Sequence, residues 1–569
     1  MRTSRLVVAL IGILAIACGR RNADRDAEAR VEPKSTDSTP VRFSVDVQKQ
    51  HTISPYIYGI NGYDRGPGTS TPDWPRGVAL NRFGGNRLTA YNWENNASNA
   101  GNDYNYQNDD FLGGGELPGE AVRVRIDGAA RKGAGTIVTI PMIGYVARDA
   151  AGTTVGTDPT TVRTRLASRF VRSDPRKPGP FSLTPSLDDD AVYQDEFVHW
   201  LTKRFPGATT SESTPLFFCL DNEPDLWGST HEEIMPKVGG KPAILTYDEL
   251  IDRTIAYARA IKDVEPRATL FGPGVATWTG ALTLGRWPSP DPRYGRRAFL
   301  DVYLERLRQE ERSTGRRLLD VLDMHWYPAG GADGQQVGND VAQQSPEMEW
   351  ARLQAPRSLW DSAYDERSWV TEVQSGPIHL LPLLREKIAT HYPGTKLAIT
   401  EYYYGRGGDI SGGIAQADVL GIFGREGVFA AALWPNAGLS AVPYGGNPAR
   451  AYAYVIGAFR MFRDFDGRGG RFGRLGLDAH TSDVPGSSVY ASTDDPSASR
   501  VVIVVLNKLS RGRVAMIDLS GSQEWSRVEV FTLTGDAPEP RQQSAPAIEG
   551  RSLRYAMPPL SVSTIVLSR

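Results

Sequence analysis

Cysteine is almost absent from this sequence: only Cys18 and Cys219 occur among its 569 residues. Two cysteines are too few for a disulfide framework, and a Cys18 that is cleaved off or modified leaves Cys219 without a partner. We therefore expect no intramolecular disulfide in the mature protein. Cys219 ends the apolar run 215–219, so we interpret it as a small buried apolar residue.

The sequence also has no excess of either sign of charge. Its 64 basic and 66 acidic residues give a formal net charge of −2. A nucleic-acid-binding protein normally carries a clustered basic excess, so this balance argues against nucleic acid as a partner and suits a neutral one. With 40% hydrophobic and 23% charged residues, the chain has the composition of a soluble globular protein with two or three domains.

Metal-binding patterns are missing as well. The seven histidines occur singly, and neither a His-Glu-x-x-His motif nor a paired-cysteine spacing is found. We see no cluster of calcium ligands with a recognisable spacing. We predict neither a metal nor a cofactor, and we interpret His231-Glu232-Glu233 as a solvated loop or helix start.

The amino-terminal apolar segment, Leu6–Ala17, is too short to span a bilayer and follows Arg2 and Arg5. This pattern predicts a signal peptide over residues 1–18. The ending Leu14-Ala-Ile-Ala-Cys18 resembles a bacterial lipobox, so Cys18 is a predicted lipidation site. We expect an exported protein at the cell surface or the outer membrane, held only by that lipid. Simple cleavage, giving a secreted or periplasmic protein, is the alternative.

Residues 19–40 carry five basic and five acidic residues and scarcely any large apolar ones. Such a segment cannot bury enough surface to offset the entropy of the chain. We predict a flexible linker.

Between residues 53 and 472, short apolar runs alternate with helix-like patterns. Alternating strands and helices predict parallel βαβ units, and eight of them predict a closed (β/α)8 barrel, the TIM barrel of the α/β class. The eight predicted strands are 56–61, 78–83, 136–142, 215–222, 269–275, 321–328, 396–404 and 428–435.

Residues 473–569 show a different pattern, with short alternating segments separated by turns rich in Gly, Pro, Ser and Asp. This pattern is typical of a β-sandwich. Residues 41–52 contain an alternating strand with no helix after it, and we expect this amino-terminal strand to complete the carboxy-terminal sandwich.

Two glutamates lie at the carboxyl ends of predicted strands, Glu223 after the fourth and Glu401 in the seventh. The carboxyl ends of barrel strands meet at the mouth, where catalytic residues collect. Hydrolysis of a glycosidic bond requires two carboxyl groups in opposite protonation states. Taken alone, Glu223 is more readily interpreted as a helix N-cap or ion-pair partner and His325 as a hydrogen-bonded core residue. The recurrence of polar residues at the ends of successive strands is what favours an active site.

Other residues at the strand ends are candidates for binding a sugar. Asn222 is placed to contact the 2-hydroxyl, and we expect Arg82 and the hydroxyl of Tyr327 or Tyr403 to stabilise the charged form of Glu401. Aromatic rings suit stacking on sugar faces. The predicted substrate-binding residues are Arg82, Asn86, Trp93, Asn222, Trp227, His325, Trp326, Tyr327, Tyr403 and Trp434.

Several motifs resemble those of known enzymes. Asn-Glu-Pro after the fourth strand and Thr-Glu in the seventh look like the clan A retaining glycoside hydrolases. A longer series, in order, resembles glycoside hydrolase family 44: Phe83-Gly-Gly-Asn86, Tyr91-Asn-Trp-Glu94, Pro141-Met-Ile-Gly-Tyr145, Val192-Tyr-Gln-Asp-Glu-Phe197, Leu220-Asp-Asn-Glu223, Met324-His-Trp-Tyr327, Ala355-Pro-Arg-Ser-Leu-Trp360, Ile399-Thr-Glu-Tyr402 and Phe465-Asp-Gly467.

This resemblance implies a barrel with a β-sandwich and endo-acting cleavage of β-1,4-glucans, such as cellulose derivatives or xyloglucan. It also implies Glu223 as the acid/base and Glu401 as the nucleophile. Two alternatives stay open: a clan A mannanase or xylanase, and a non-catalytic glycan-binding lipoprotein, which would not need both carboxylates. We expect a polysaccharide partner and a monomer.

Overall fold

The computed structural model describes residues 39–62, 76–340, 344–434, 444, 447–521 and 524–569. Cys18, the predicted signal peptide and all but the last two residues of the predicted linker lie outside these ranges. Across the described ranges, no helix combines the length and the apolar character that crossing a membrane requires.

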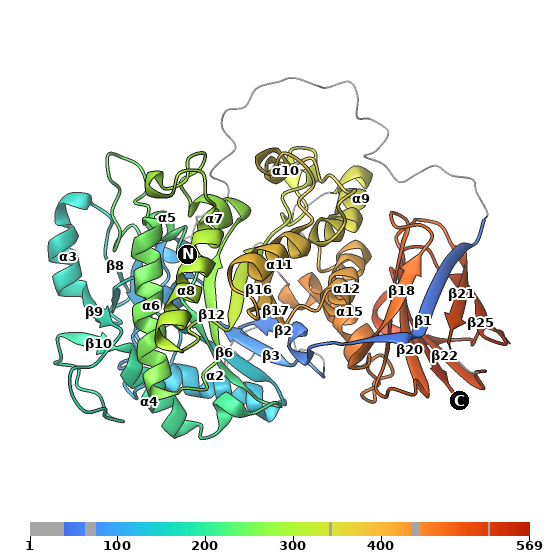
Figure 1. Ribbon diagram of the computed structural model, residues 1–569, viewed down its shortest axis with the longest axis horizontal. Helices are drawn as coiled ribbons and strands as arrows, with labels where there is room; N and C mark the ends of the chain where they lie inside the picture. Colours follow the sequence, from blue (N-terminus) through green and yellow to red (C-terminus); the bar gives the residue numbers. More distant parts are fainter. Residues whose placement is uncertain (1–38, 63–75, 341–343, 435–443, 445–446, 522–523) are drawn as a thin grey trace, which may run out of the picture.

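The central element is a closed barrel of eight parallel strands in the order in which they occur along the chain (Figure 1). All eight predicted strands are present, so the predicted barrel is confirmed. The strands are β2 (Gly59–Asn61), β3 (Leu80–Phe83), β6 (Gly135–Ile140), β11 (Leu216–Leu220), β12 (Leu270–Val275), β13 (Val321–Trp326), β16 (Lys396–Tyr402) and β17 (Ala430–Leu433).

The interior of the barrel is filled with side chains from these strands. Phe217 and Cys219 of β11 pack there with Phe271, Val321 and residues of the other strands. Cys219 is buried, as predicted. Because this interior is packed, only side chains at the carboxyl ends of the strands can reach a substrate.

Helices surround the barrel, and most of them bury one apolar face. In α6 (Tyr247–Val264), buried residues recur at helical spacing, and a capping box formed by Thr246 and Glu249 begins the helix. The other long helices are α2 (Glu120–Arg131), α3 (Val162–Arg169), α4 (Gln194–Arg204), α8 (Phe299–Thr314), α9 (Pro346–Gln354), α11 (Leu380–His391), α12 (Ile410–Arg425) and α15 (Ala453–Arg463).

Short elements lie among the loops, several of them at the mouth end of the barrel. Their helices are α1 (Asn86–Thr89), α5 (Trp227–Thr230), α7 (Trp278–Thr283), α10 (Trp369–Gln374) and α14 (Pro448–Ala451). Their strands form three small sheets: β4 (Ser98–Asn99), β5 (Gln107–Asp109) and β8 (Thr153–Thr154); β7 (Tyr145–Ala147), β9 (Phe170–Asp174) and β10 (Ala191–Tyr193); and β14 (Gly331–Ala332) and β15 (Gln335–Gln336).

The carboxy-terminal strands form one sheet of ten strands that curls over its own core. Tyr555, near one end of the sheet, reaches the other end: its hydroxyl lies 2.9 Å from Ser563 Oγ and 3.3 Å from Thr532 Oγ1. The strands are β18 (Leu475–Thr481), β19 (Ser487–Thr493), β20 (Arg500–Asn507), β21 (Arg513–Ser520), β22 (Arg527–Thr534), β23 (Ala537–Gln543), β24 (Ile548–Glu549), β25 (Ser552–Met557), β26 (Ser561–Ser568) and β1.

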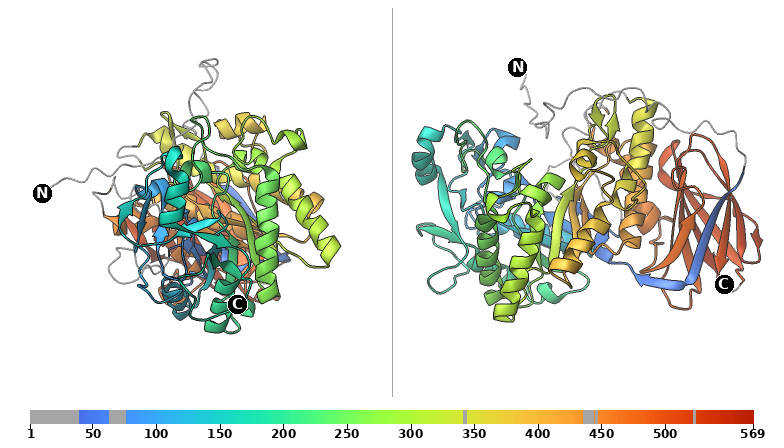
Figure 2. Two further views of the ribbon diagram at one scale, coloured as in Figure 1. Left: turned by 90° about the vertical axis from the view of Figure 1, so that its left-hand side faces the viewer. Right: turned by 45° about the horizontal axis from the view of Figure 1, so that its top comes forward.

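The amino-terminal strand β1 (Val41–Thr52) lies inside this sheet, between β18 and β21 (Figures 1 and 2). It pairs antiparallel with β18 and parallel with β21. Every second residue from Val41 to Val47 is buried in the sandwich core, which explains the alternating pattern. The prediction that this strand completes the sandwich is confirmed.

Helices α12 and α15 connect the barrel to the sandwich. The residues of α12 are buried on all sides because β19, β20 and β26 cover the face that solvent would otherwise reach. Within this contact, Asp418 of α12 forms a buried ion pair of 2.7 Å with Lys508 Nζ and accepts a hydrogen bond of 2.6 Å from the Tyr490 hydroxyl. The two parts of the molecule therefore share a buried polar contact as well as apolar packing.

Candidate active site

Glu223 projects from a tight turn directly after β11. Asp221 and Glu223 both have left-handed backbone conformations, with φ of 67° and 46°. The buried Asp221 side chain fixes this turn: its Oδ1 accepts hydrogen bonds from Thr89 Oγ1 at 2.6 Å and from the Asn222 backbone at 2.7 Å, and its Oδ2 accepts one from the Met142 backbone. The hydrogen bonds of Asp221 therefore stabilise the strained backbone conformation that directs the Glu223 side chain into the barrel mouth.

Glu401 lies on β16 and is held by two donors. Arg82 Nη1 lies 2.6 Å from Glu401 Oε1, and the Tyr327 hydroxyl donates to Oε2 at 3.0 Å. The Arg82 side chain is fully buried and also donates to Asn61 Oδ1 at 3.1 Å and to Asn222 Oδ1 at 2.8 Å. These contacts orient Glu401 and stabilise its negative charge.

Two glycines make this arrangement possible. A β-carbon at Gly84 would overlap the guanidinium group of Arg82, and one at Gly85 would overlap the ring of Trp434. Gly85 also has φ of 93°, a conformation that favours glycine. The Gly-Gly of the Phe83-Gly-Gly-Asn86 motif thus provides room for the arginine and the tryptophan.

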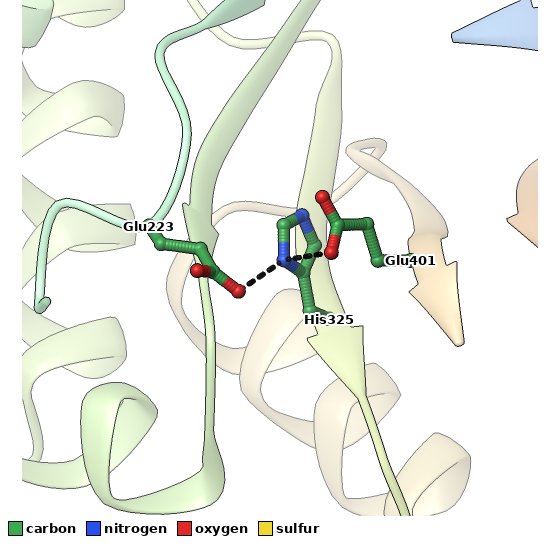
Figure 3. A group of neighbouring side chains, drawn as sticks. All are labelled: Glu223, His325 and Glu401. Carbon is green, nitrogen blue, oxygen red and sulfur yellow. Dashed lines mark hydrogen bonds and ion pairs between the residues drawn. The ribbon is translucent and has the colours of Figure 1, made fainter. Parts of the chain in front are cut away.

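His325, at the end of β13, lies between the two glutamates (Figure 3). Its Nδ1 lies 2.8 Å from Glu223 Oε1 and 3.4 Å from Glu401 Oε2. Burial lowers the pKa of His325 to about 3, with Glu401 opposing the shift and Arg82 adding to it, so the imidazole is neutral. One oxygen of each glutamate and this nitrogen all lie within 4.8 Å of one another.

Two carboxylates and an imidazole nitrogen are also ligands that a divalent metal accepts. At this place, however, the buried guanidinium of Arg82 already supplies a positive charge to Glu401.

The two glutamates have different electrostatic environments. Burial raises the pKa of Glu223 to about 7; the charge of Arg82 opposes this shift and that of Asp103 adds to it. Glu401 instead contacts a cation and a hydroxyl donor. Glu223 is therefore suited to carry a proton near neutral pH, whereas Glu401 is oriented by a cation and a hydroxyl donor, an asymmetry that glycoside hydrolysis requires.

Comparison with known proteins places this geometry in a family. The glycoside hydrolase family 44 sequence profile matches residues 97–330. Endoglucanase A of Paenibacillus lautus is 40% identical over 551 residues, which cover 93% of this chain and 73% of that protein. The chain belongs to glycoside hydrolase family 44. A family 44 xyloglucanase from Paenibacillus polymyxa, solved with xyloglucan, matches with a TM-score of 0.82 and 35% identity over 93% of this chain and 99% of the other. A family 44 endoglucanase from Clostridium thermocellum matches with the same four values.

In this family 44 glycoside hydrolase, six of the predicted substrate-binding residues lie together at the barrel mouth. Asn222 Nδ2 donates to Asn86 Oδ1 at 3.2 Å, while Asn222 Oδ1 accepts from Arg82 and from the Gly85 backbone. Their side chains are linked directly or through the glutamates, except for Trp434, which packs over Gly85. The six are Arg82, Asn86, Asn222, His325, Tyr327 and Trp434.

Three predicted sugar-stacking tryptophans are core residues instead. Trp93, Trp227 and Trp326 are at most 2% exposed, so their rings offer no face to a substrate. Trp93 stacks on Phe197 with ring centroids 5.3 Å apart. Trp227 donates from Nε1 to the Asn222 carbonyl at 2.9 Å and so supports the turn of Glu223. The sequence showed that these rings lie near strand ends, but not which way they point.

Of the two tyrosines expected to donate to Glu401, Tyr327 does so, whereas the Tyr403 hydroxyl donates to Asp340 Oδ2 at 2.9 Å. One further expectation is corrected. His231 and Glu233 are not solvated: both side chains are fully buried and lie 2.7 Å apart. His231 Nε2 also lies 2.9 Å from the Asn86 carbonyl oxygen, which places this pair behind the mouth.

Sequence reasoning missed three residues that shape the site. Asn61 and Asp221 contact Arg82 and the Glu223 turn, and Asp103 contacts Asn86. Asn61 and Asp221 do stand at the ends of predicted strands, a signal that could have identified them. Asp103 lies on a single 3-10 turn, which is too short for any periodicity to mark it.

Proposed function

We propose that this protein is an endo-acting, retaining glycoside hydrolase that cleaves β-1,4-glucan chains such as cellulose derivatives and xyloglucan. The observation that carries this proposal is the unequal environment of two carboxyl groups across one mouth. Glu223 is buried with a pKa of about 7, whereas Glu401 faces Arg82 and Tyr327. This difference suits Glu223 to act as the acid and Glu401 to act as the nucleophile.

In the first step, Glu401 attacks the anomeric carbon while Glu223 gives its proton to the leaving glycosidic oxygen. Carboxyl oxygens within 4.8 Å of each other fit the short carboxyl separation of retaining enzymes rather than the longer separation that accommodates an attacking water in inverting ones, which favours direct attack. In the second step, Glu223 removes a proton from water, which hydrolyses the glycosyl-enzyme. Two displacements at one carbon retain the β configuration.

The neighbouring side chains support these two steps. Neutral His325 contacts both glutamates through Nδ1 and so maintains their separation. Asn222 is fixed by Arg82 and Asn86, and its amide is positioned for the sugar 2-hydroxyl, a contact that strengthens in the transition state.

The substrate class is supported by the relatives, whose names give endoglucanase and xyloglucanase activities. A panel of xyloglucan, carboxymethylcellulose, glucomannan and xylan tests it. We expect xyloglucan or carboxymethylcellulose to be cleaved fastest, with viscosity falling well before reducing ends accumulate. A preference for glucomannan or xylan would favour the mannanase or xylanase alternative. If no glycan on the panel is cleaved, the result would favour a non-catalytic glycan-binding lipoprotein.

The site of action is a separate part of the proposal. The lipobox-like sequence before Cys18 supports export and attachment through an amino-terminal lipid, with residues 19–40 as a spacer. We propose a monomer at the cell surface or outer membrane. Fractionation and intact mass of wild type and Cys18→Ser test this: a soluble wild-type protein without acyl mass would mean ordinary signal cleavage.

A further inference from the structure

Asp103 is a carboxylate at the barrel mouth that the mechanism above does not use. It lies on the short 3-10 helix η2 (Gly101–Tyr104), and the residue as a whole is exposed, although its carboxyl group lies close enough to surrounding protein to be partly desolvated. Two features fix η2 beside the turn of Glu223. Asn102 Nδ2 donates to the Ser229 carbonyl at 3.2 Å, and Gly101 packs so closely that a β-carbon there would overlap the Thr230 carbonyl. Asp103 is therefore held against α5.

A chain of hydrogen bonds connects Asp103 to Glu401. Asn86 Nδ2 donates to Asp103 Oδ2 at 2.9 Å, and Asn86 Oδ1 accepts from Asn222 Nδ2 at 3.2 Å. Asn222 in turn accepts from Arg82, which binds Glu401. The Asp103 carboxylate thus sets the orientation of the Asn86 amide, because an oxygen acceptor on one side selects the NH2 group and turns the carbonyl oxygen toward Asn222.

The charge of Asp103 also acts on the acid/base. Burial is the largest cause of the raised pKa of Glu223. The charge of Arg82 opposes this shift, and the negative charge of Asp103 raises the pKa further. Surrounding protein raises the pKa of Asp103 itself, while Asn86, His231 and Arg87 favour its charged form. The titratable groups that face Glu223 are Arg82, Asp103, Asp225, His325, Tyr327 and Glu401. Of these described groups, Asp103 is the most exposed to solvent.

We propose that Asp103 is a further substrate-binding carboxylate of this site, which accepts a hydrogen bond from a sugar hydroxyl and holds Asn86 against Asn222. This inference rests on the proposed glycoside hydrolase function. Oδ2 is engaged by Asn86, and a carboxylate accepts at both oxygens, so the exposed Asp103 has further capacity to accept a hydrogen bond from a hydroxyl. Asn222 is the proposed contact of the 2-hydroxyl, and Asp103 is linked to Asn222 through Asn86, so Asp103 would bind a different hydroxyl of the substrate. A charged acceptor makes a stronger bond than a neutral one.

The test compares wild type with Asp103→Asn, which keeps the shape of the side chain and an acceptor oxygen but removes the charge. Activity on xyloglucan is followed as a function of pH. We expect KM to rise roughly tenfold, as for the loss of a hydrogen bond to a charged group, with a smaller change in kcat. We also expect the basic limb of the profile to move to lower pH by about half a unit.

Asp110→Asn is the matched control, because it removes one negative charge from an exposed side chain of the same loop region. It should leave KM and the basic limb unchanged. The inference is overturned if Asp103→Asn keeps the wild-type KM and basic limb, or if Asp110→Asn moves them equally. A wild-type enzyme that cleaves no glycan would instead contradict the proposed function, so the two failures are distinguishable. Circular dichroism melting shows whether each variant is folded.

Discussion

Arg82 Nη1 lies 2.6 Å from Glu401 Oε1, although the two residues are 319 positions apart in the sequence. Arg82 is fully buried on β3 and Glu401 lies on β16, so the ion pair crosses the barrel mouth. The same guanidinium group binds Asn61 and Asn222. One side chain therefore positions both the proposed nucleophile and the residue that faces the sugar.

We predict that Arg82→Lys lowers kcat/KM on xyloglucan by about 100-fold or more. A lysine retains the charge, but its compact ammonium group cannot reproduce the planar fork that contacts three oxygen acceptors. Arg123→Lys is the matched control, because the ion pairs of Arg123 within the described part of the chain are those with its helix neighbours Glu120 and Asp127. A loss of activity shared by both variants, or by neither, would contradict the role assigned to Arg82.

We predict that Glu223→Gln abolishes the basic limb of the pH–activity profile. Glu223 must be protonated in the first step, so kcat/KM of the wild type should fall as pH rises through about 7. The variant should still form the glycosyl-enzyme from substrates with good leaving groups, which need no proton. A variant that retains the wild-type basic limb would rule out Glu223 as the acid.

The same substitution should stabilise the protein at alkaline pH. The pKa of Glu223 is raised from 4.5 to about 7 in the folded state, so folding becomes less favourable as pH rises through that window and the full cost is present above it. Glutamine removes this cost, which is on the order of 3 kcal/mol at 1.36 kcal/mol per unit. Urea unfolding at pH 8 should show Glu223→Gln as the more stable protein, and the difference should vanish below pH 4.

We predict that Glu401→Gly loses activity by several orders of magnitude and regains it with azide on an activated β-glycoside. The small anion occupies the place of the carboxylate and attacks once, so the product should be the α-glycosyl azide. Wild type should release the β anomer first, as NMR before mutarotation would show. An initial α anomer from wild type would instead make Glu401 a general base.

We predict that Asp418→Asn destabilises the protein by about 3–5 kcal/mol in urea unfolding, because it leaves Lys508 buried without a counter-charge. Replacing both residues, as Asp418→Leu with Lys508→Met, should cost clearly less, since no uncompensated charge remains. Kinetic constants of the folded double variant should match wild type. Equal losses in the single and double variants would show that packing, rather than charge pairing, matters at this contact.

The sequence alone determined the architecture and the two glutamates, because both depend on local patterns. Eight buried runs alternating with helical periods specify a parallel barrel whatever side chains line it, and a carboxylate placed directly after such a run must reach the mouth. The strand at 41–52 was recognisable for the same reason: its period of two requires one buried face.

Only the tertiary structure decided which side chains meet. Tyr327 rather than Tyr403 binds Glu401, and Trp93, Trp227 and Trp326 pack into the core, because the direction of a side chain depends on neighbours from distant segments. His231 and Glu233 look like solvated polar residues in the sequence, yet both side chains are buried and each is the polar partner of the other. The position of Asp103 likewise follows from the contact of its loop with α5, which no local pattern encodes.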